Sequence, residues 1–91
     1  MKLILCSACG DVRKLGDFPT VCQCGKASGV HTAGGLRATY SGAAIPLFID
    51  NNSLASAVHR WRAQDARAYG IRFTAGVSGQ KSASFKREKE E

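Results

Sequence analysis

Long apolar runs are missing from this chain of 91 residues. An α-helical membrane span needs about 20 consecutive, mostly apolar residues, and no segment approaches that length. The chain opens on Met1-Lys2, a run of three aliphatic residues and Cys6, which superficially resembles a lipoprotein signal. A secretory signal needs an apolar core of about 7–15 residues, so we interpret this segment as a first β-strand. We therefore expect a cytoplasmic protein that has no membrane partner.

Acidic residues are scarce as well, because 7 Asp and Glu stand against 13 Lys and Arg, a formal net charge of +6. A zinc ion held by four thiolates would lower that charge to about +4. The remaining excess favours anionic partners only mildly, and it lacks the dense basic stripe of a dedicated DNA-binding protein. Catalytic signatures are also missing, since there is no serine-histidine-aspartate arrangement, phosphate-binding loop or supported carboxylate pair. We expect a protein that is not an enzyme.

Four cysteines near the start of the chain are its most informative feature. Cys6 and Cys9 form a CxxC pair, and after twelve further residues Cys22 and Cys24 form a CxC pair. A glycine follows the second cysteine of each pair, where its freedom to adopt positive φ lets backbone amides turn toward the sulfurs. Two close pairs joined by a hairpin-length segment suit a tetrahedral thiolate site. We predict one structural Zn²⁺ per chain, bound by these four cysteines.

Other uses of the cysteines have less support in the sequence. Disulfide bonds need an oxidising compartment, which nothing in the sequence indicates. A thioredoxin-like redox pair needs its first cysteine at a helix N-terminus, whereas Gly10 and Asp11 indicate a turn. Iron is the alternative metal, because four thiolates accept either ion. His31 is an alternative ligand, although an exposed histidine in a glycine-rich loop is the simpler interpretation.

The pattern along the chain predicts an α+β fold, with one main helix on a small antiparallel sheet. We expect a single zinc-stabilised domain over residues 1–77, with a zinc-ribbon-like knuckle at 1–26 and a β-β-α-β unit at 37–77. Residues 27–36 are small, polar and rich in glycine, so we expect a connecting loop. Residues 78–91 are rich in Ser, Lys and Glu, and there we expect a flexible charged tail.

Alternation and turn residues predict the individual strands. Pro46 has no N–H to donate, so its strand should lie at a sheet edge or begin at the proline. Such an edge, with an exposed sheet face, could support homo-oligomerisation. The expected strands are 2–5, 37–40, 45–49 and 71–75, together with a hairpin whose arms are 12–15 and 18–21.

One helix is predicted from Asn52 or Ser53, either of which can cap it, to about Tyr69. Gly70 follows at the position of a left-handed C-terminal cap. The free amides of the first turn also make Asn52 and Ser53 a candidate site for an anionic small ligand. At about 100° per residue, one face of the helix is apolar and should pack on the sheet. That face contains Leu54, Ala57, Val58, Trp61, Ala68 and Tyr69.

Basic residues near the cysteines raise nucleic-acid binding as a second possibility. The arginines of the predicted helix border its apolar stripe and leave the far face poor in charge, which argues against a recognition helix. A phosphate-contacting surface near the cysteine pairs stays open, although simple solvation also explains each basic residue. Its candidates are Arg13, Lys14, Lys26 and Arg37.

The motifs together resemble a group of uncharacterised small bacterial and phage proteins, zinc-ribbon-like, that open with CxxC and CxCG. The resemblance covers residues 3–58 and departs from the group at Phe48-Ile49-Asp50, where smaller residues are expected. It implies a zinc-ribbon-like module of bacterial or phage origin and carries no activity with it. The matching segments after the CxxC pair are Cys22-x-Cys24-Gly25, Ala38-x-Tyr40-x-Gly42-x-Ala44-x-Pro46-Leu47 and Asn52-Ser53-Leu54.

These observations favour a small zinc-binding regulatory or accessory protein that is not an enzyme and acts through a protein partner. Nucleic-acid binding is the alternative function. Binding of an anionic small ligand at the helix N-terminus is the third.

Overall fold

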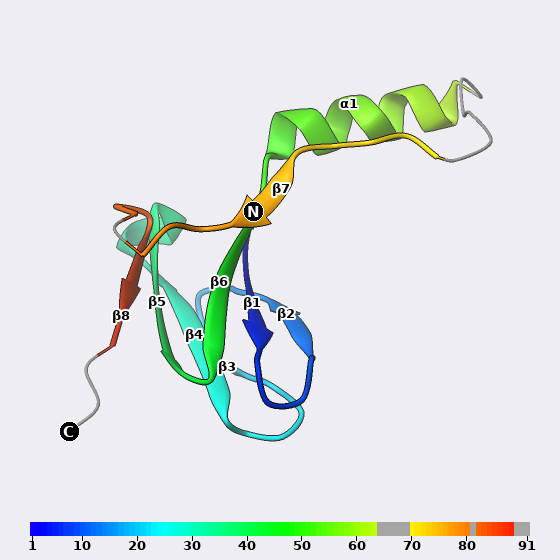
Figure 1. Cartoon of the computed structure of the whole chain (residues 1–91). Helices are drawn as coiled ribbons and strands as arrows, with labels where there is room; N and C mark the ends of the chain where they lie inside the picture. Colours follow the sequence, from blue (N-terminus) through cyan, green and yellow to red (C-terminus); the bar gives the residue numbers. More distant parts are fainter. Residues whose placement is uncertain (64–69, 81, 89–91) are drawn as a thin grey trace.

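The computed structural model describes residues 1–63, 70–80 and 82–88, which form two four-stranded sheets and one α-helix (Figure 1). Sheet A has the strand order β2-β1-β6-β7, and sheet B has the order β3-β4-β5-β8. All neighbouring strands are antiparallel except β5 and β8, which run parallel. The elements are β1 (Lys2–Cys6), β2 (Val12–Lys14), β3 (Thr20–Val21), β4 (Ala27–Thr32), the 3-10 turn η1 (Ala33–Gly35), β5 (Arg37–Gly42), β6 (Ala44–Ile49), α1 (Asn51–Arg62), β7 (Ala75–Val77) and β8 (Phe85–Arg87).

The core lies between the two sheets. Along β1 the burial alternates, with Ile4 and Cys6 facing the core and Leu3 and Leu5 on the opposite face. The buried cluster draws on both sheets and on the segment after β2, and two of the four cysteines belong to it, so the cysteine cluster is built into the core. Its members are Ile4, Cys6, Leu15, Cys22, Ala27, Ala38, Tyr40, Ala44 and Phe85.

The strands expected at 2–5, 37–40 and 45–49 are confirmed, but the position of Pro46 differs from the prediction. β6 pairs with β1 on one side and β7 on the other, so it is not an edge strand and offers no free edge for oligomerisation. The Pro46 carbonyl accepts a bond of 2.9 Å from the amide of Ser78. The N and O atoms of one residue point to the same side of a strand. The Pro46 nitrogen, which has no hydrogen to donate, therefore faces the end of β7.

The expected loop at 27–36 is wrong, because Ala27–Thr32 forms β4 in the middle of sheet B. The small residues that suggested a loop have a packing role instead. A Cβ built on Gly29 would lie 2.9 Å from a methyl carbon of Leu15, so only glycine leaves room for that buried leucine. The glycine therefore marks a close approach within the core, as glycines inside strands often do.

The expected hairpin of 12–15 and 18–21 is also wrong. β2 pairs with β1 in sheet A, whereas β3 pairs with β4 in sheet B. Leu15 separates the two strands because its side chain, only 1% exposed, enters the core between the sheets. The Gly16 carbonyl accepts a bond of 2.7 Å from the His31 amide, which holds this turn against β4.

The predicted β-β-α-β unit does not form, because the chain changes sheets at Gly42. β5 belongs to sheet B and β6 to sheet A. Gly42 has φ +68°, and a Cβ there would collide with the carbonyl oxygen of Lys26, so this corner needs glycine.

The expected tail at 78–91 is likewise wrong for Phe85–Arg87, which forms β8 beside β5. Phe85 is buried there, and its ring meets the Tyr40 ring edge-on at 6.2 Å between centroids.

The helix does not cover a sheet as predicted; α1 projects away from both sheets (Figure 1). Asp50 caps it, since its carboxylate accepts a bond of 3.2 Å from the Ser53 amide, so the prediction of Asn52 or Ser53 as the cap is wrong. The helix ends at Arg62, and the continuation expected to Tyr69 falls on residues 64–69, outside the described ranges. Gly70 has the positive φ expected of it, +86°, but the C-cap of the helix is Ala63, so the prediction of Gly70 as the cap is wrong. The closing strand forms at Ala75–Val77 rather than 71–75. Among the described residues, no helix is long and apolar enough to cross a membrane.

Candidate metal centre

Four cysteine sulfurs gather at one end of the two sheets. The Sγ atoms of Cys6, Cys9, Cys22 and Cys24 all lie within 4.8 Å of one another. Cys6 ends β1, Cys22 follows β3, and the other two cysteines lie in the turns that come next. Cys6 and Cys22 are buried whereas Cys9 and Cys24 are exposed, so the cluster reaches from the core to the surface. The predicted ligand set is therefore brought together in the fold.

Each cysteine pair is held by a tight turn that ends at a glycine. The Gly10 amide donates to the Cys6 carbonyl at 2.8 Å, and the Gly25 amide donates to the Cys22 carbonyl at 3.1 Å. Both glycines have positive φ, +77° and +80°, which side chains disfavour. The first bond joins residues four positions apart and the second joins residues three apart, so the shorter spacing of the second pair gives a tighter turn that still ends at a glycine.

The spacing of the sulfurs fits a tetrahedral ion. The Sγ of Cys24 lies 3.6 Å from that of Cys6 and 3.5 Å from that of Cys22. A tetrahedron with metal–sulfur bonds of about 2.3 Å has sulfur–sulfur edges of about 3.8 Å. The cluster is thus close to the size that Zn²⁺ requires, and four thiolates also accommodate iron.

Backbone amides around the cluster stabilise thiolates. The Ala27 amide donates to the Cys22 sulfur at 3.3 Å. Burial raises the pKa of Cys22, but the Ala27 amide and the neighbouring thiols outweigh it and bring that pKa down to about 6. The amides of Asp11 and Cys24 likewise lower the pKa of Cys9. Such N–H···S bonds offset the negative charge of a thiolate site.

The close approach of the four sulfurs opposes ionisation of Cys24. The Lys26 amide lowers the pKa of Cys24, but the Cys22 sulfur and burial outweigh it and raise that pKa to about 12. The sulfurs of Cys9 and Cys6 add to the same effect. A divalent cation at the centre would remove this repulsion, because metal ligation deprotonates a thiol outright.

Asp11 joins the two turns and was not identified from the sequence. Its carboxylate accepts bonds from the Arg13 side chain at 2.7 Å and from the Gln23 amide at 2.9 Å. Gln23 lies between Cys22 and Cys24, so the residue after the first turn fixes the backbone of the second. Arg13 lowers the pKa of Asp11 through its hydrogen bond, which keeps the carboxylate ionised. An acid directly after Cys9-Gly10 was the available signal.

The corner between β5 and β6 braces the cluster from the other side. The Ala43 amide donates to the Lys26 carbonyl at 2.8 Å, next to the second turn. The Ala43 carbonyl accepts the Ser7 amide at 2.9 Å and the Ser7 hydroxyl at 3.0 Å, inside the first turn. The backbone N–H and C=O of one residue, Ala43, thus contact both cysteine turns.

His31 lies outside the cluster. It belongs to β4 rather than to a loop, and its Nδ1 lies 3.8 Å from the carboxylate of Asp17. The His31 side chain is mostly buried, with about half the exposed fraction of the Arg13 side chain. The expectation of a solvent-exposed loop histidine is therefore wrong.

The four basic candidates for phosphate contact do not converge on one face. Arg13 and Lys14 are consecutive in β2 and point to opposite sides of sheet A. Lys26 precedes β4 at the cysteine end, whereas Arg37 pairs with Thr32 at the far end of the same hairpin. Arg13 is also engaged by Asp11. The phosphate-contacting surface built from these residues therefore gains no support from their placement.

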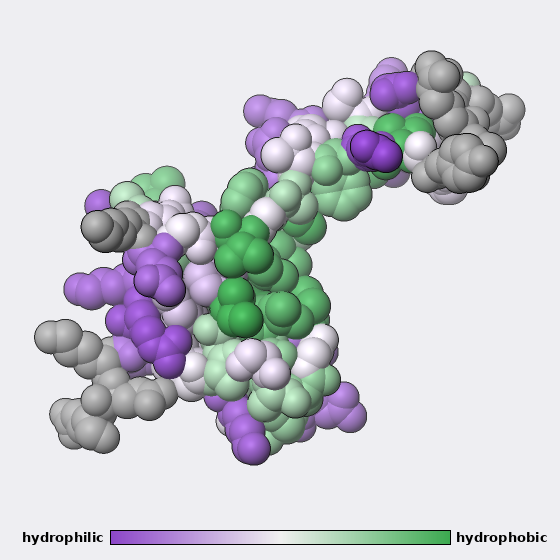
Figure 2. Space-filling model, viewed as in Figure 1, coloured by the Kyte–Doolittle hydropathy of each residue, from purple (hydrophilic) through white to green (hydrophobic). Residues whose placement is uncertain are grey.

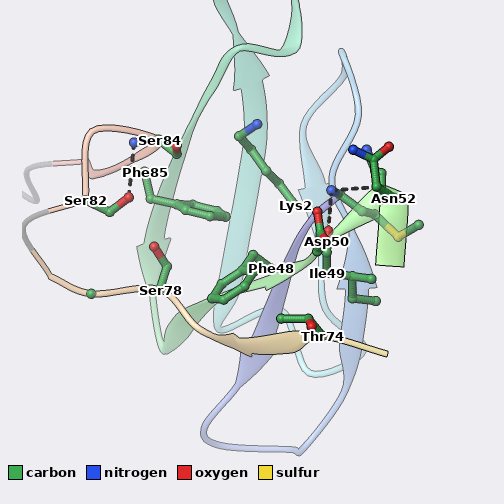
Figure 3. A pocket seen from close by; sticks show the side chains of 13 residues that line it. Lys2, Phe48, Ile49, Asp50, Asn52, Thr74, Ser78, Ser82, Ser84 and Phe85 are labelled. Atoms are coloured by element: carbon green, nitrogen blue, oxygen red, sulfur yellow. Dashed lines mark hydrogen bonds between the residues drawn. The ribbon is translucent and has the colours of Figure 1, made fainter. Parts of the chain in front are cut away.

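Asn52 lines an open cleft of about 880 Å³ near the start of the helix, whereas Ser53 does not. Figure 3 shows Asp50 and Asn52 on one wall of this cleft, Ser82 and Ser84 on the other, and the rings of Phe48 and Phe85 between them. The Ser53 hydroxyl already accepts the Thr74 amide at 2.6 Å, and the Asp50 carboxylate caps the helix. A carboxylate in that position repels an anion, so the predicted anion site loses its electrostatic basis.

Comparison with protein-family models, curated proteins and solved structures finds no match for this chain. The resemblance to small bacterial and phage proteins therefore stays a prediction.

Proposed function

We propose that this chain is a small, non-enzymatic zinc protein that acts through a protein partner. The observation that carries the metal assignment is the convergence of four sulfurs within 4.8 Å on two tight turns that each end at a glycine. Four protein thiolates complete a tetrahedral shell and leave no position for a reactive water. The metal would serve the fold, as the knuckle of a zinc-ribbon-like module does.

Zinc binding and folding are coupled in this proposal. Cys6 and Cys22 are part of the buried core, so a metal that fixes them also fixes β1 and the start of β4. Structural zinc sites contribute roughly 10–16 kcal/mol of apparent binding free energy near pH 7. A domain below about 100 residues has a limited core of its own, and such domains often depend on a staple of this kind.

A protein partner is favoured by the surface beside the metal turns. Phe18 is 81% exposed and lies in the segment before β3, whereas Val21 is 50% exposed and lies in β3 itself, at the edge of sheet B and directly before Cys22. Exposed aromatic and aliphatic side chains at a sheet edge are typical of protein contacts, whereas phosphate contacts need converging bases. We place the partner surface at Phe18 and Val21, beside the metal site that holds β3 in position.

Native mass spectrometry tests the metal assignment. The wild-type chain should carry one zinc ion, and a Cys22→Ser, Cys24→Ser double variant should lose both the zinc and the folded state. Ser7→Ala is the matched control, since it removes a hydroxyl from the first turn without removing a ligand. A wild-type protein that is fully folded and metal-free would overturn the proposal.

Affinity capture tests the partner. A tagged wild-type chain should recover a partner protein that Phe18→Asp loses while its zinc content stays unchanged. Leu36→Asp is the control, because Leu36 is 77% exposed and lies by η1, away from the metal turns. Equal recovery of the partner by the wild type and by Phe18→Asp would show that Phe18 is not part of the partner surface.

A further inference from the structure

One face of sheet A is apolar and uncovered. The strand register places on it the residues that alternate with the core-facing ones, so Leu3 opposes Leu47 and Leu5 opposes both Ile45 and Val12. Figure 2 shows this area as a continuous green surface over the sheet. We call it the outer face; its apolar members are Leu3, Leu5, Val12, Ile45, Leu47, Ile49, Ala75 and Val77.

The helix of the same chain cannot cover this face. Only Asp50 separates the end of β6 from the start of α1. The returning segment is fixed at the same point, because the Asp50 amide donates to the Thr74 carbonyl at 2.9 Å and the Thr74 amide donates to the Ser53 hydroxyl at 2.6 Å. The helix and residues 70–74, which we call the arm, therefore leave the sheet as a unit (Figure 1).

The arm has an apolar face that is also left open. Residues Leu54, Val58 and Trp61 share this face with Ile71 and Phe73 from the returning segment, and together they line a shallow groove. Trp61 is 65% exposed and Phe73 is 44% exposed. An amphipathic helix of this kind obtains most of its stability from packing against another element. Residues 70–74 supply part of that packing and bury Ala57, but they leave Trp61 and Phe73 exposed.

We propose that two copies of this chain exchange arms, each arm packing its apolar face on the outer face of the other copy. The two surfaces match in length, because twelve helical residues span about 18 Å. The six residues of β6 span about 20 Å. A twofold axis that places one arm on the partner places the second arm equivalently, so the assembly closes at two chains. The expected packing of helix on sheet is then satisfied between chains.

The area is sufficient for a stable dimer. Eight outer-face residues and five arm residues take part in each chain. If each apolar side chain loses about 50 Å² of exposed surface, the dimer buries about 1,300 Å² in total, within the range of about 1,200–2,000 Å² for specific interfaces. The basic residues Arg60 and Arg62 flank the apolar stripe of the arm and would stay at the rim of the contact.

Light scattering with size-exclusion chromatography on the zinc-loaded full chain tests the exchange. The wild type should have the mass of two chains, whereas Trp61→Asp in the arm and Val77→Lys in the outer face should each give a monomer. Both side chains are largely exposed within one chain, so circular dichroism and zinc content should stay unchanged. Phe18→Asp is the control; its exposed aromatic ring lies on neither surface, and it should stay a dimer. Phe73→Asp repeats the arm test if Trp61→Asp fails to fold.

Mixing the two monomeric variants distinguishes arm exchange from direct packing of two outer faces. The Trp61→Asp chain keeps an intact outer face, and the Val77→Lys chain keeps an intact arm, so the mixture retains one of the two contacts. The mixture should form a dimer, although neither variant forms one alone. This mixed dimer should dissociate more readily than the wild-type dimer. A wild type that is monomeric, or a Trp61→Asp variant that dimerises as tightly as the wild type, would overturn the proposal. Since zinc content is measured separately, neither result bears on the metal assignment.

Discussion

Replacing Gly42 with alanine is the substitution that should disturb this molecule most for its size. Gly42 has φ +68°, and its missing side chain leaves room for the Lys26 carbonyl. The same carbonyl accepts a hydrogen bond from the Ala43 amide. An alanine at positive φ costs about 1–2 kcal/mol in the backbone alone. The collision with Lys26 moves the corner and breaks at least the Ala43–Lys26 bond, which adds about 1 kcal/mol, with further loss from core repacking. We expect a total destabilisation of about 3–5 kcal/mol for Gly42→Ala.

Gly34→Ala is the matched control, because Gly34 also has φ +68° but has no atom within 4 Å of the position of its Cβ. It should cost only the backbone strain of about 1–2 kcal/mol. Urea denaturation of both zinc-loaded variants measures the difference, provided that the slope of the transition stays unchanged. Equal losses for the two glycines would refute the argument that the corner at Gly42 is sterically fixed against the second cysteine turn.

Three further predictions follow from the same contacts. Asp11→Asn should weaken zinc binding about 10-fold, because it weakens the link between the two turns, while the control Asp17→Asn should leave zinc binding unchanged. Competition with a chromogenic chelator measures both affinities. Equal affinities of the two variants would contradict the role of Asp11. Acid should release zinc and lower stability together, since protons compete for the thiolates. Cys22, whose pKa is lowered to about 6, should resist protonation more than an ordinary thiol does. Stability that persists after the zinc has left would contradict this coupling. Phe85→Ala should cost about 3–4 kcal/mol because the ring is buried, whereas Phe18→Ala should cost less than about 0.5 kcal/mol in urea denaturation; similar losses for both would show that β8 does not dock on β5.

The cysteine cluster could be predicted from the sequence because its information is local. The CxxC and CxC pairs each close within one turn, and Gly10 and Gly25 mark those turns. The strands β1 and β6 were also predictable, since aliphatic residues dominate them, and β5 was predictable from its place before the turn residues Ser41 and Gly42. Local patterns of this type depend little on the rest of the chain.

The long-range arrangement was not predictable in the same way. Ala27–Thr32 has too few apolar side chains to indicate a buried strand, and its role depends on Leu15 filling the space above Gly29. Phe85 is a lone aromatic in a polar segment, and only its place beside Tyr40 makes it part of the core. The change of sheet at Gly42 depends on Lys26, which lies sixteen residues earlier in the chain. Each of these misses is a case in which tertiary packing overrides local pattern.

The same distinction applies to the helix. Its apolar stripe predicted packing on the sheet, but the stripe faces residues Ile71 and Phe73 instead, and the sequence could not show that the helix would leave the sheet. The bonds of Thr74 to Asp50 and Ser53 decide that direction, and they join residues more than twenty positions apart.

X-ray absorption at the zinc edge, on protein loaded with one equivalent of metal, measures the ligand shell of the proposed site. Four sulfur neighbours at about 2.3 Å are predicted, with no nitrogen or oxygen in the first shell. A shell that contains an imidazole or water, or fewer than four sulfurs, would contradict the closed site formed by Cys6, Cys9, Cys22 and Cys24.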